Sequence, residues 1–225
     1  MDKIPLIDLH AQYESIKSDV DEAIAQVIEG GFFIGGSAVS QFERSFAMAC
    51  GIRHCVGLAN GTDALMIALH ALNVGAGDEV ITVAMSWIST ADTISRCGAT
   101  PVFVDIEPDG YNIDVTLIEK KINSRTRAII VVHLYGHPAD MDPVVALCKK
   151  HGLKLIEDCA QAHLAKYKGV GVGQFGDIAT FSFYPTKNLG AYGDAGAIVT
   201  NDDALATQCR LIASQGASVR HHHVQ

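Results

Sequence analysis

Short apolar, β-branched runs alternate with stretches of helical periodicity between residues 54 and 200. The runs predict strands over His54–Leu58, Glu79–Val83, Thr100–Val104, Ala128–His133, Lys154–Glu157, Ile178–Ser182 and Ala197–Val199. The stretches between several of them predict helices over Asp63–Leu72, Thr90–Cys97, Asp114–Ile122 and Met141–Lys150. Continuous apolar runs are typical of strands buried on both faces. The alternation therefore predicts an α/β fold with three layers, in which helices cover a mostly parallel sheet.

The first fifty residues carry a different pattern. Apolar residues recur there at helical spacing and predict one amphipathic helix: Ile16, Val20, Ile24, Val27 and Ile28. Gly30 and Gly31 are expected to end this helix, and residues 30–36 form an ordered glycine-rich loop. A second helix is expected to start at Ser37, as its N-cap residue, and to run to about Ala49. We expect residues 1–50 to be a helical arm of one domain that continues over residues 51–225.

Composition narrows the class of protein. The chain has 225 residues, 48% of them hydrophobic and 19% charged, which is typical of a globular domain. Its net charge of −8, without a cluster of Lys or Arg, gives no reason to expect nucleic acid or an anionic membrane as a partner. The longest apolar run, Ala128–Val132, is too short to span a bilayer, and the N-terminus does not resemble a signal peptide.

Cysteine and histidine residues could form a disulfide framework or a metal site. The six cysteines are scattered without a C-x-x-C pair, which favours reduced thiols in the cytoplasm over a disulfide framework. The adjacent histidines His221–His223 could bind a metal, but neighbouring side chains point in different directions on a regular element. We therefore expect no metal site.

Ligands of open α/β sheets gather at the carboxyl ends of the strands, so the residues that follow each strand are candidates. After the first strand come Asn60, Gly61, Thr62 and Asp63, which open a helix. Gly61 permits a tight turn, and the N–H groups of the first helical turn can bind a phosphate. The alternative is an ordinary turn capped by Thr62 or Asp63.

Two further strand ends carry candidate residues. Trp87, the only tryptophan, follows the second strand and could stack on a planar ring; the alternative is a core or interface aromatic. Glu157 and Asp158 end the fifth strand, and strand alternation points one of them inward. A buried carboxylate needs a cationic partner, which a protonated pyridine nitrogen would provide. The alternative is an acid that caps the next turn.

Lys187 lies among aromatic residues after the strand Ile178–Ser182 and before the glycines Gly190, Gly193 and Gly196. Burial lowers the pKa of a lysine, and the neutral amine attacks an aldehyde to form an imine. Most lysines are solvated surface charges, which is the alternative here. Ser182 could bind a phosphate or cap a turn.

Several ordered motifs carry a resemblance to a known family. They are NGTDAL, GDEVIT, GATPVFVDI, YNID, VHLYGHPADMD, IEDCAQAH and FSFYPTKNLGAYGDAGAIVTND. In this order they resemble the DegT/DnrJ/EryC1/StrS family of sugar aminotransferases over practically the whole chain. The resemblance implies the pyridoxal phosphate (PLP) fold type I, which is the aspartate aminotransferase-like large domain. It also implies transfer of an amino group from glutamate to a nucleotide-diphosphate keto sugar, in amino-sugar and polysaccharide biosynthesis.

The resemblance implies a role for each candidate residue. Lys187 holds PLP covalently and moves protons, and Asp158 pairs with the pyridine nitrogen. Gln161 lies near the ring hydroxyl, and Trp87 stacks on the ring. Gly61, Thr62, Asp63 and Ser182 surround the phosphate.

The resemblance also bears on the rest of the protein. It implies a homodimer with shared active sites and a small C-terminal domain that lies beyond Gln225. Thr186 and Trp87 depart from the family's commoner residues, glycine or serine and phenylalanine or tyrosine. A related dehydratase subgroup has histidine in place of the lysine, so Lys187 favours transamination. A PLP-dependent sugar dehydratase and a regulatory protein on the same fold remain the alternatives.

Overall fold

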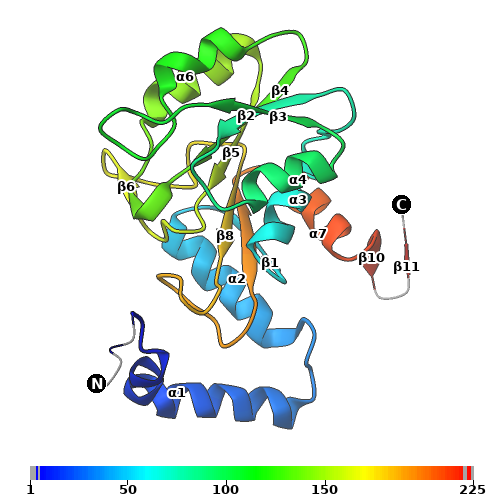
Figure 1. The fold of residues 1–225 in the computed structure, drawn as a ribbon. Coiled ribbons are helices and arrows are strands. Elements are labelled where there is room, and N and C mark those ends of the chain that lie inside the picture. The colour runs from blue at the N-terminus through cyan, green and yellow to red at the C-terminus, as the bar shows by residue number, and fades with distance from the viewer. Residues whose placement is uncertain (1–3, 5, 220–221, 224–225) are drawn as a thin grey trace.

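The computed structural model describes residues 4, 6–219 and 222–223 of the chain (Figure 1). A seven-stranded sheet with the order β1-β9-β8-β5-β4-β2-β3 forms its centre. These strands are β1 (His54–Leu58), β2 (Glu79–Val83), β3 (Thr100–Val104), β4 (Thr126–Val132), β5 (Lys154–Asp158), β8 (Ile178–Ser182) and β9 (Gly196–Thr200). Only β9 runs against its neighbours β1 and β8, while the other neighbouring pairs are parallel. The predicted mostly parallel α/β sheet is confirmed.

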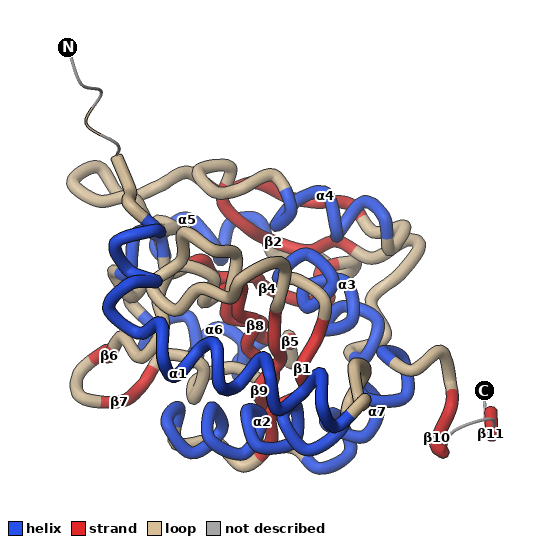
Figure 2. The backbone as a smooth tube through the Cα atoms, turned by 90° about the horizontal axis from the view of Figure 1, so that it is seen from below, coloured by secondary structure: helices blue, strands red, loops and turns tan. Residues whose placement is uncertain are grey.

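Helices cover both faces of this sheet (Figures 1 and 2). On one face α3 (Gly61–Ala71), α4 (Ser89–Arg96) and α7 (Asp203–Ala213) pack on inward-facing residues of six strands, among them Ile130 and Ile156. On the other face lie α6 (Met141–His151), the short α5 (Val115–Ile118) and α2 (Gly36–Cys50). Successive strand residues alternate between the two faces, as Ile129 and Ile130 do, because side chains of a strand alternate.

The first helix, α1 (Leu9–Gly30), lies apart from these layers, at the bottom of Figure 1. None of its residues is buried, and Ile16, Ile24 and Ile28 remain exposed although their spacing is amphipathic. Gly31 ends it in the left-handed conformation, as expected. The expected N-cap of the second helix is wrong: Ser37 lies inside α2, and the cap position is Gly35, which has no side chain to bond the first turn.

Most predicted helices and strands begin and end within two residues of the observed ones, but several short elements were not predicted. Beyond the predicted strands lie β6 (Lys166–Tyr167), β7 (Val170–Gly171), β10 (Ala217–Val219) and β11 (His222–His223). The predicted helix Asp114–Ile122 is α5 followed by a 3₁₀ turn, η1 (Glu119–Lys121), and a second such turn is η2 (Leu134–Gly136). His221 lies outside the described residues, so the three-histidine run is described only in part.

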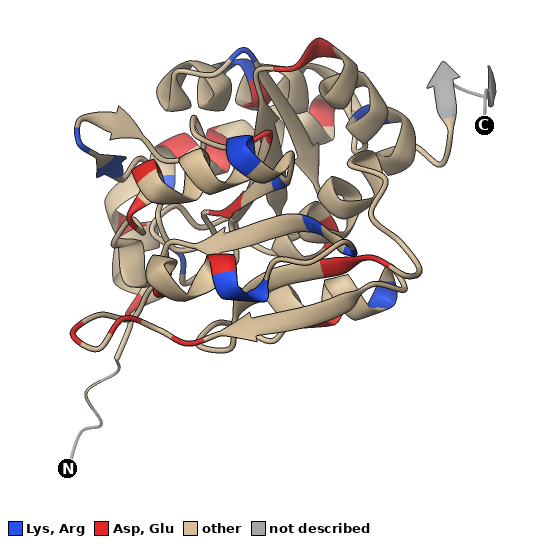
Figure 3. Cartoon of the chain, turned by 90° about the horizontal axis from the view of Figure 1, so that it is seen from above, with Lys and Arg blue, Asp and Glu red and all other residues tan. Residues whose placement is uncertain are grey.

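Two observations bear on partners. Lys and Arg residues are spread over several elements rather than gathered in one patch in the view of Figure 3. Among the described residues, no helix combines the length and the hydropathy needed to cross a bilayer.

Candidate active site

The candidate residues come from the carboxyl ends of four strands of the sheet. Gly61–Asp63 follow β1, Trp87 follows β2, Asp158 ends β5, and Ser182 ends β8, with Lys187 five residues further along the chain. Strands β2, β5 and β8 are parallel to one another through β4, and β1 runs the same way as β8. These ends therefore meet at one edge of the sheet, where open α/β proteins bind ligands.

Both acids at the end of β5 are buried, which corrects the expectation that only one of them points inward. Glu157 has no exposed surface and Asp158 is 5% exposed. Because they are neighbours in one strand, they lie on opposite faces of the sheet. Asp158 faces α4, where the Thr90 hydroxyl donates a hydrogen bond to its Oδ2 over 2.9 Å. Glu157 lies on the other face and contacts His133.

Asp158 is a buried carboxylate with few partners. It accepts bonds from the Thr90 hydroxyl and from the Ala160 N–H, and Ser86 bonds Thr90 in turn over 2.8 Å. Among the described residues it forms no ion pair. Burial raises the pKa of Asp158 above its ordinary value, while these hydrogen bonds and the charge of Lys187 oppose the shift.

Lys187 lies in the turn after β8, held by a backbone bond from its N–H to the Tyr184 carbonyl over 2.8 Å. Its side chain is half-buried, and this burial lowers the pKa of its amine. The negative charge of Asp158 opposes that shift. The side chain is therefore only partly solvated, and the role of Lys187 as a nucleophile stays a prediction.

The first turn of α3 and the end of β8 are in contact. A Cβ built on Gly61 would lie 2.7 Å from the Cβ of Ser182, so only glycine fits there without a shift. The Thr62 hydroxyl lies 2.7 Å from that of Ser89, at the start of α4. We call Gly61, Thr62 and Ser182, which the sequence predicts to surround a phosphate, the phosphate seat; the N-terminus of α3 lies there, and a helix N-terminus can bind a phosphate.

The cap of α3 differs from both sequence alternatives. Asn60, not Thr62 or Asp63, is the N-cap residue, and its Oδ1 accepts the Asp63 N–H over 2.8 Å. The Asp63 carboxylate is bonded to the Asn60 amide as well. Both polar groups of Asp63 are therefore used within the turn, and its predicted contact with a phosphate stays a prediction.

Trp87 and Gln161 complete the predicted set. Trp87 is 73% exposed, so it is not a core aromatic, and its ring is accessible for stacking or for an interface. The Oε1 atom of Gln161 accepts a bond from the Tyr135 backbone N–H over 2.8 Å. This contact leaves the amide nitrogen of Gln161 as the atom that can donate to a ligand.

Sequence reasoning assigned no role to three residues of this region. Thr90 and Ser89 lie in the first turn of α4, directly after β2, and the same strand-end rule would have found them. His163 lies in the motif IEDCAQAH, which predicted no role for it. Its Nε2 lies 2.9 Å from the Ser182 carbonyl, and its Nδ1 is buried without a partner among the described residues. Burial lowers the pKa of His163, and the positive charge of Lys187 adds to this.

The residues present fit PLP. A protonated pyridine nitrogen would give Asp158 the cationic partner that its buried position lacks among the described side chains. The phosphate seat offers a helix N-terminus and hydroxyl donors for a phosphate monoester. The half-buried amine of Lys187 suits covalent bonding to an aldehyde.

Comparison with curated proteins gives close relatives. The chain is 49% identical over 220 residues to a protein of Geobacillus stearothermophilus named pleiotropic regulatory protein, covering 98% of this chain and 59% of that protein. It is 47% identical over 222 residues to the UDP-2-acetamido-2-deoxy-3-oxo-D-glucuronate aminotransferase of Pseudomonas aeruginosa, covering 99% and 62%. The chain thus spans about three fifths of the length of the curated relatives it matches.

Solved structures also include proteins that closely resemble this chain. The S. venezuelae protein DesV, in complex with a ketimine intermediate, superposes with a TM-score of 0.97 at 44% identity, covering 100% of this chain and 61% of that one. The protein ntda from Bacillus subtilis, with bound cofactor PMP, has a TM-score of 0.93 at 33% identity, covering 100% of this chain and 52% of that one.

The family model described as the DegT/DnrJ/EryC1/StrS aminotransferase family matches residues 14–225, and the chain belongs to this family.

Proposed function

We propose that the edge of the sheet described above binds PLP and transfers amino groups. The observation that carries the proposal is that the buried Asp158 ends β5 and the half-buried Lys187 follows β8, its parallel neighbour, at one edge of the sheet. Burial shifts the pKa of both groups toward their neutral forms, which supports it. When bound, PLP supplies an electron sink for the carbon that loses its proton. Residues 51–225 would form the cofactor-binding domain, with residues 1–50 as an arm.

The side chains of this chain have separate tasks in the proposal. Asp158 keeps the ring nitrogen protonated, because a buried anion stabilises a nearby positive charge. The phosphate seat and Trp87 orient the cofactor. Lys187 forms the covalent bond and, once released, carries a proton as general base and acid at its Nζ atom.

Glutamate is the proposed amino donor, and a nucleotide-linked keto sugar is the proposed acceptor. The aminotransferase of P. aeruginosa supports the acceptor class, since its name specifies a UDP-linked oxo sugar. Assembly as a homodimer and a cytoplasmic location complete the proposal. They rest on membership of the family.

The donor half of the reaction can be tested on the chain as it stands. After loading with PLP and removal of the excess, we expect glutamate to yield 2-oxoglutarate up to about one equivalent per bound cofactor. Lys187→Ala should yield none, while Lys149→Ala, which removes an exposed lysine of α6, should behave as the parent chain. Cofactor bound without any 2-oxoglutarate, or no cofactor bound at all, would contradict the proposal.

Two other functions remain candidates. The name of the G. stearothermophilus relative favours a regulatory role on this fold. A regulatory protein has no need of a desolvated lysine beside a buried acid, and the glutamate assay separates the two. A sugar dehydratase on the same scaffold would act on its sugar without consuming stoichiometric glutamate.

A further inference from the structure

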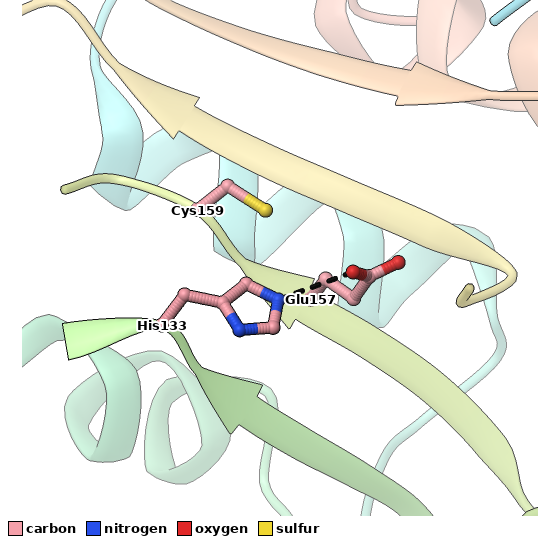
Figure 4. Close-up of side chains that lie close together, drawn as sticks. All are labelled: His133, Glu157 and Cys159. Carbon is pink, nitrogen blue, oxygen red and sulfur yellow. Dashed lines mark hydrogen bonds and ion pairs between the residues drawn. The ribbon is translucent and has the colours of Figure 1, made fainter. Parts of the chain in front are cut away.

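The second acid of β5, Glu157, lies at the centre of a buried cluster with His133 and Cys159 (Figure 4). One potential ligand atom of each residue lies within 4.8 Å of the others, which is a spacing that could suit a metal ion. The hydrogen bonds indicate a different role. Figure 4 shows the imidazole of His133 bonded to the Glu157 carboxylate, with no bond to Cys159.

Four N–H groups occupy the Glu157 carboxylate. Oε2 accepts from Gly173 N over 2.8 Å and faces the Nε2 atom of His133 over 3.1 Å. Oε1 accepts from Phe175 N over 2.8 Å and from Gly176 N over 2.7 Å. A carboxylate has about four lone-pair directions, so this one has none left for a metal.

The hydrogen bonds also define the tautomer of His133. The backbone N–H of Ala139 can only donate, and it points at Nδ1 over 3.1 Å. Nδ1 must therefore carry a lone pair, and the ring proton lies on Nε2, which donates to Glu157. If Nδ1 were protonated instead, it would oppose the Ala139 N–H. Glu157 thus fixes the ring in the one form that accepts from Ala139.

The bond from Ala139 closes the segment between residues 133 and 139, which we call the His133 loop. Asn112 bridges it, accepting from Leu134 N over 3.1 Å and donating to the His137 carbonyl over 2.9 Å. Within it, Tyr135 has a φ of 55°, which non-glycine residues rarely adopt. Such backbone persists only where its surroundings determine it, and the bonds of His133 and Asn112 do so here.

This strained turn directs the Tyr135 N–H at the Oε1 atom of Gln161, over 2.8 Å. A backbone N–H can only meet the oxygen of a carboxamide, so the orientation of the Gln161 amide is determined. A Cβ on Gly136 would lie 3.3 Å from the Gln161 carbonyl, which shows how closely the loop approaches this turn. With Oε1 held by the Tyr135 N–H, the amide nitrogen is the donor that Gln161 can offer to a ligand, and Oε1 keeps one further lone pair.

We propose that Glu157 and His133 are positioning residues that act through the His133 loop to hold Gln161 as a hydrogen-bond donor. That this Gln161 donor points toward the ring oxygen of PLP rests on the function proposed above. An N–H donor stabilises the oxygen anion, which an amide turned the other way would repel. Glu157 and His133 then support the cofactor site although they lie on the other face of the sheet, and Cys159 has no part in this role.

Nitrogen NMR of the histidine rings tests the first step on the parent chain, without cofactor and without any substitution. We expect His133 to show an unprotonated Nδ1 and a protonated Nε2, unchanged when Zn²⁺ is added. A protonated Nδ1, or a shift of both nitrogens with Zn²⁺, would overturn the proposal.

Hydrogen exchange tests the loop. In His133→Phe, which leaves Glu157 three donors, the amides of Ala139 and Tyr135 should exchange roughly tenfold faster, as expected for the loss of one buried hydrogen bond. Cys159→Ala removes the third member of the cluster and should leave both rates unchanged. Equal rates in His133→Phe and the parent chain would contradict the proposal.

The cofactor provides a third measurement. With PLP bound, the pH midpoint of its visible absorbance should move upward in His133→Phe and not in Cys159→Ala, because the ring oxygen loses its donor. A purely structural role would lower stability without moving this midpoint, and that outcome would overturn the positioning role. If the chain binds no PLP, the proposed function fails, while the NMR and exchange results still decide whether the loop is held as described.

Discussion

Glu157 and Asp158 are neighbours in one strand, yet their surroundings differ. Glu157 accepts four N–H bonds and has no exposed surface. Asp158 has two hydrogen-bond partners and the charge of Lys187 nearby, and burial raises its pKa. The fully bonded acid stabilises the fold, and the sparsely bonded one is available to a ligand. A buried acid therefore indicates a binding site only when its partners are incomplete.

The largest effect is expected from Asp158→Asn. Losing a positioned charge at a reacting centre costs about 10²- to 10³-fold in rate, and we expect the glutamate half-reaction to slow by that much. The measurement is single-turnover formation of 2-oxoglutarate. An unchanged rate would mean that Asp158 and Glu157 are equivalent structural acids.

The same variant should leave the cofactor-free fold intact and change its pH dependence. Because the pKa of Asp158 is raised in the folded chain, that chain holds the proton more tightly than the unfolded one. Its stability therefore falls as pH rises from the ordinary value of 3.8 through the raised value. Urea unfolding across this range should show a smaller fall for Asp158→Asn. A steeper fall in the stability of Asp158→Asn would contradict the raised pKa of Asp158.

Glu157→Gln, unlike Asp158→Asn, should destabilise the fold. Its amide group must face at least one of the four N–H donors, so we expect a loss of about 3 kcal/mol in the free energy of unfolding. Cys159→Ala, in the same cluster, is the control for substitution in a buried site. A Glu157→Gln chain as stable as the parent would show that the four bonds contribute little.

Gly61→Ala tests the contact between α3 and β8. The added Cβ would lie 2.7 Å from the Cβ of Ser182, and such overpacking costs about 1–3 kcal/mol. Gly75→Ala is the matched control, since its nearest neighbour would be 3.8 Å away. We expect Gly61→Ala alone to unfold at lower urea and to bind PLP more weakly. Equal behaviour of the two variants would contradict the close approach.

Trp87→Ala should have the smallest effect and act on binding alone. The ring is 73% exposed, so stability should change by no more than about 0.5 kcal/mol. Stacking contributes about 0.5–1.5 kcal/mol, so PLP should bind roughly two- to thirteenfold more weakly, and Trp87→Phe should restore most of this. Equilibrium titration of cofactor absorbance measures both. Unchanged affinity in Trp87→Ala would remove Trp87 from the site.

The sequence predicted the layers of the fold because several strands are apolar runs, as β2 and β4 are, and helices follow most of them. It did not predict that β9 runs against its neighbours, because apolar runs carry no direction. Strands β6 and β7 have two residues each, too few to show alternation. Helix α7 was missed although Asp202, its N-cap residue, bonds two N–H groups of its first turn.

The candidate site was largely predictable because its residues follow strand ends. The different surroundings of the two acids were not, because they depend on distant partners. Three of the four donors to Glu157 come from residues 173–176 and the fourth is His133, while Thr90 lies 68 residues from Asp158 in the chain. The cap of α3 was assigned wrongly among near neighbours, where Asn60, Thr62 and Asp63 all have side chains able to cap.

The most direct test is to load the chain with PLP, reduce it with borohydride and locate the label by peptide mass. Lys187 should carry the label in the parent chain and in Glu157→Gln under folding conditions, because both retain the desolvated amine beside Asp158. A folded, PLP-treated chain with no label, or with the label on a different lysine, would contradict the assignment of this edge of the sheet as the active site.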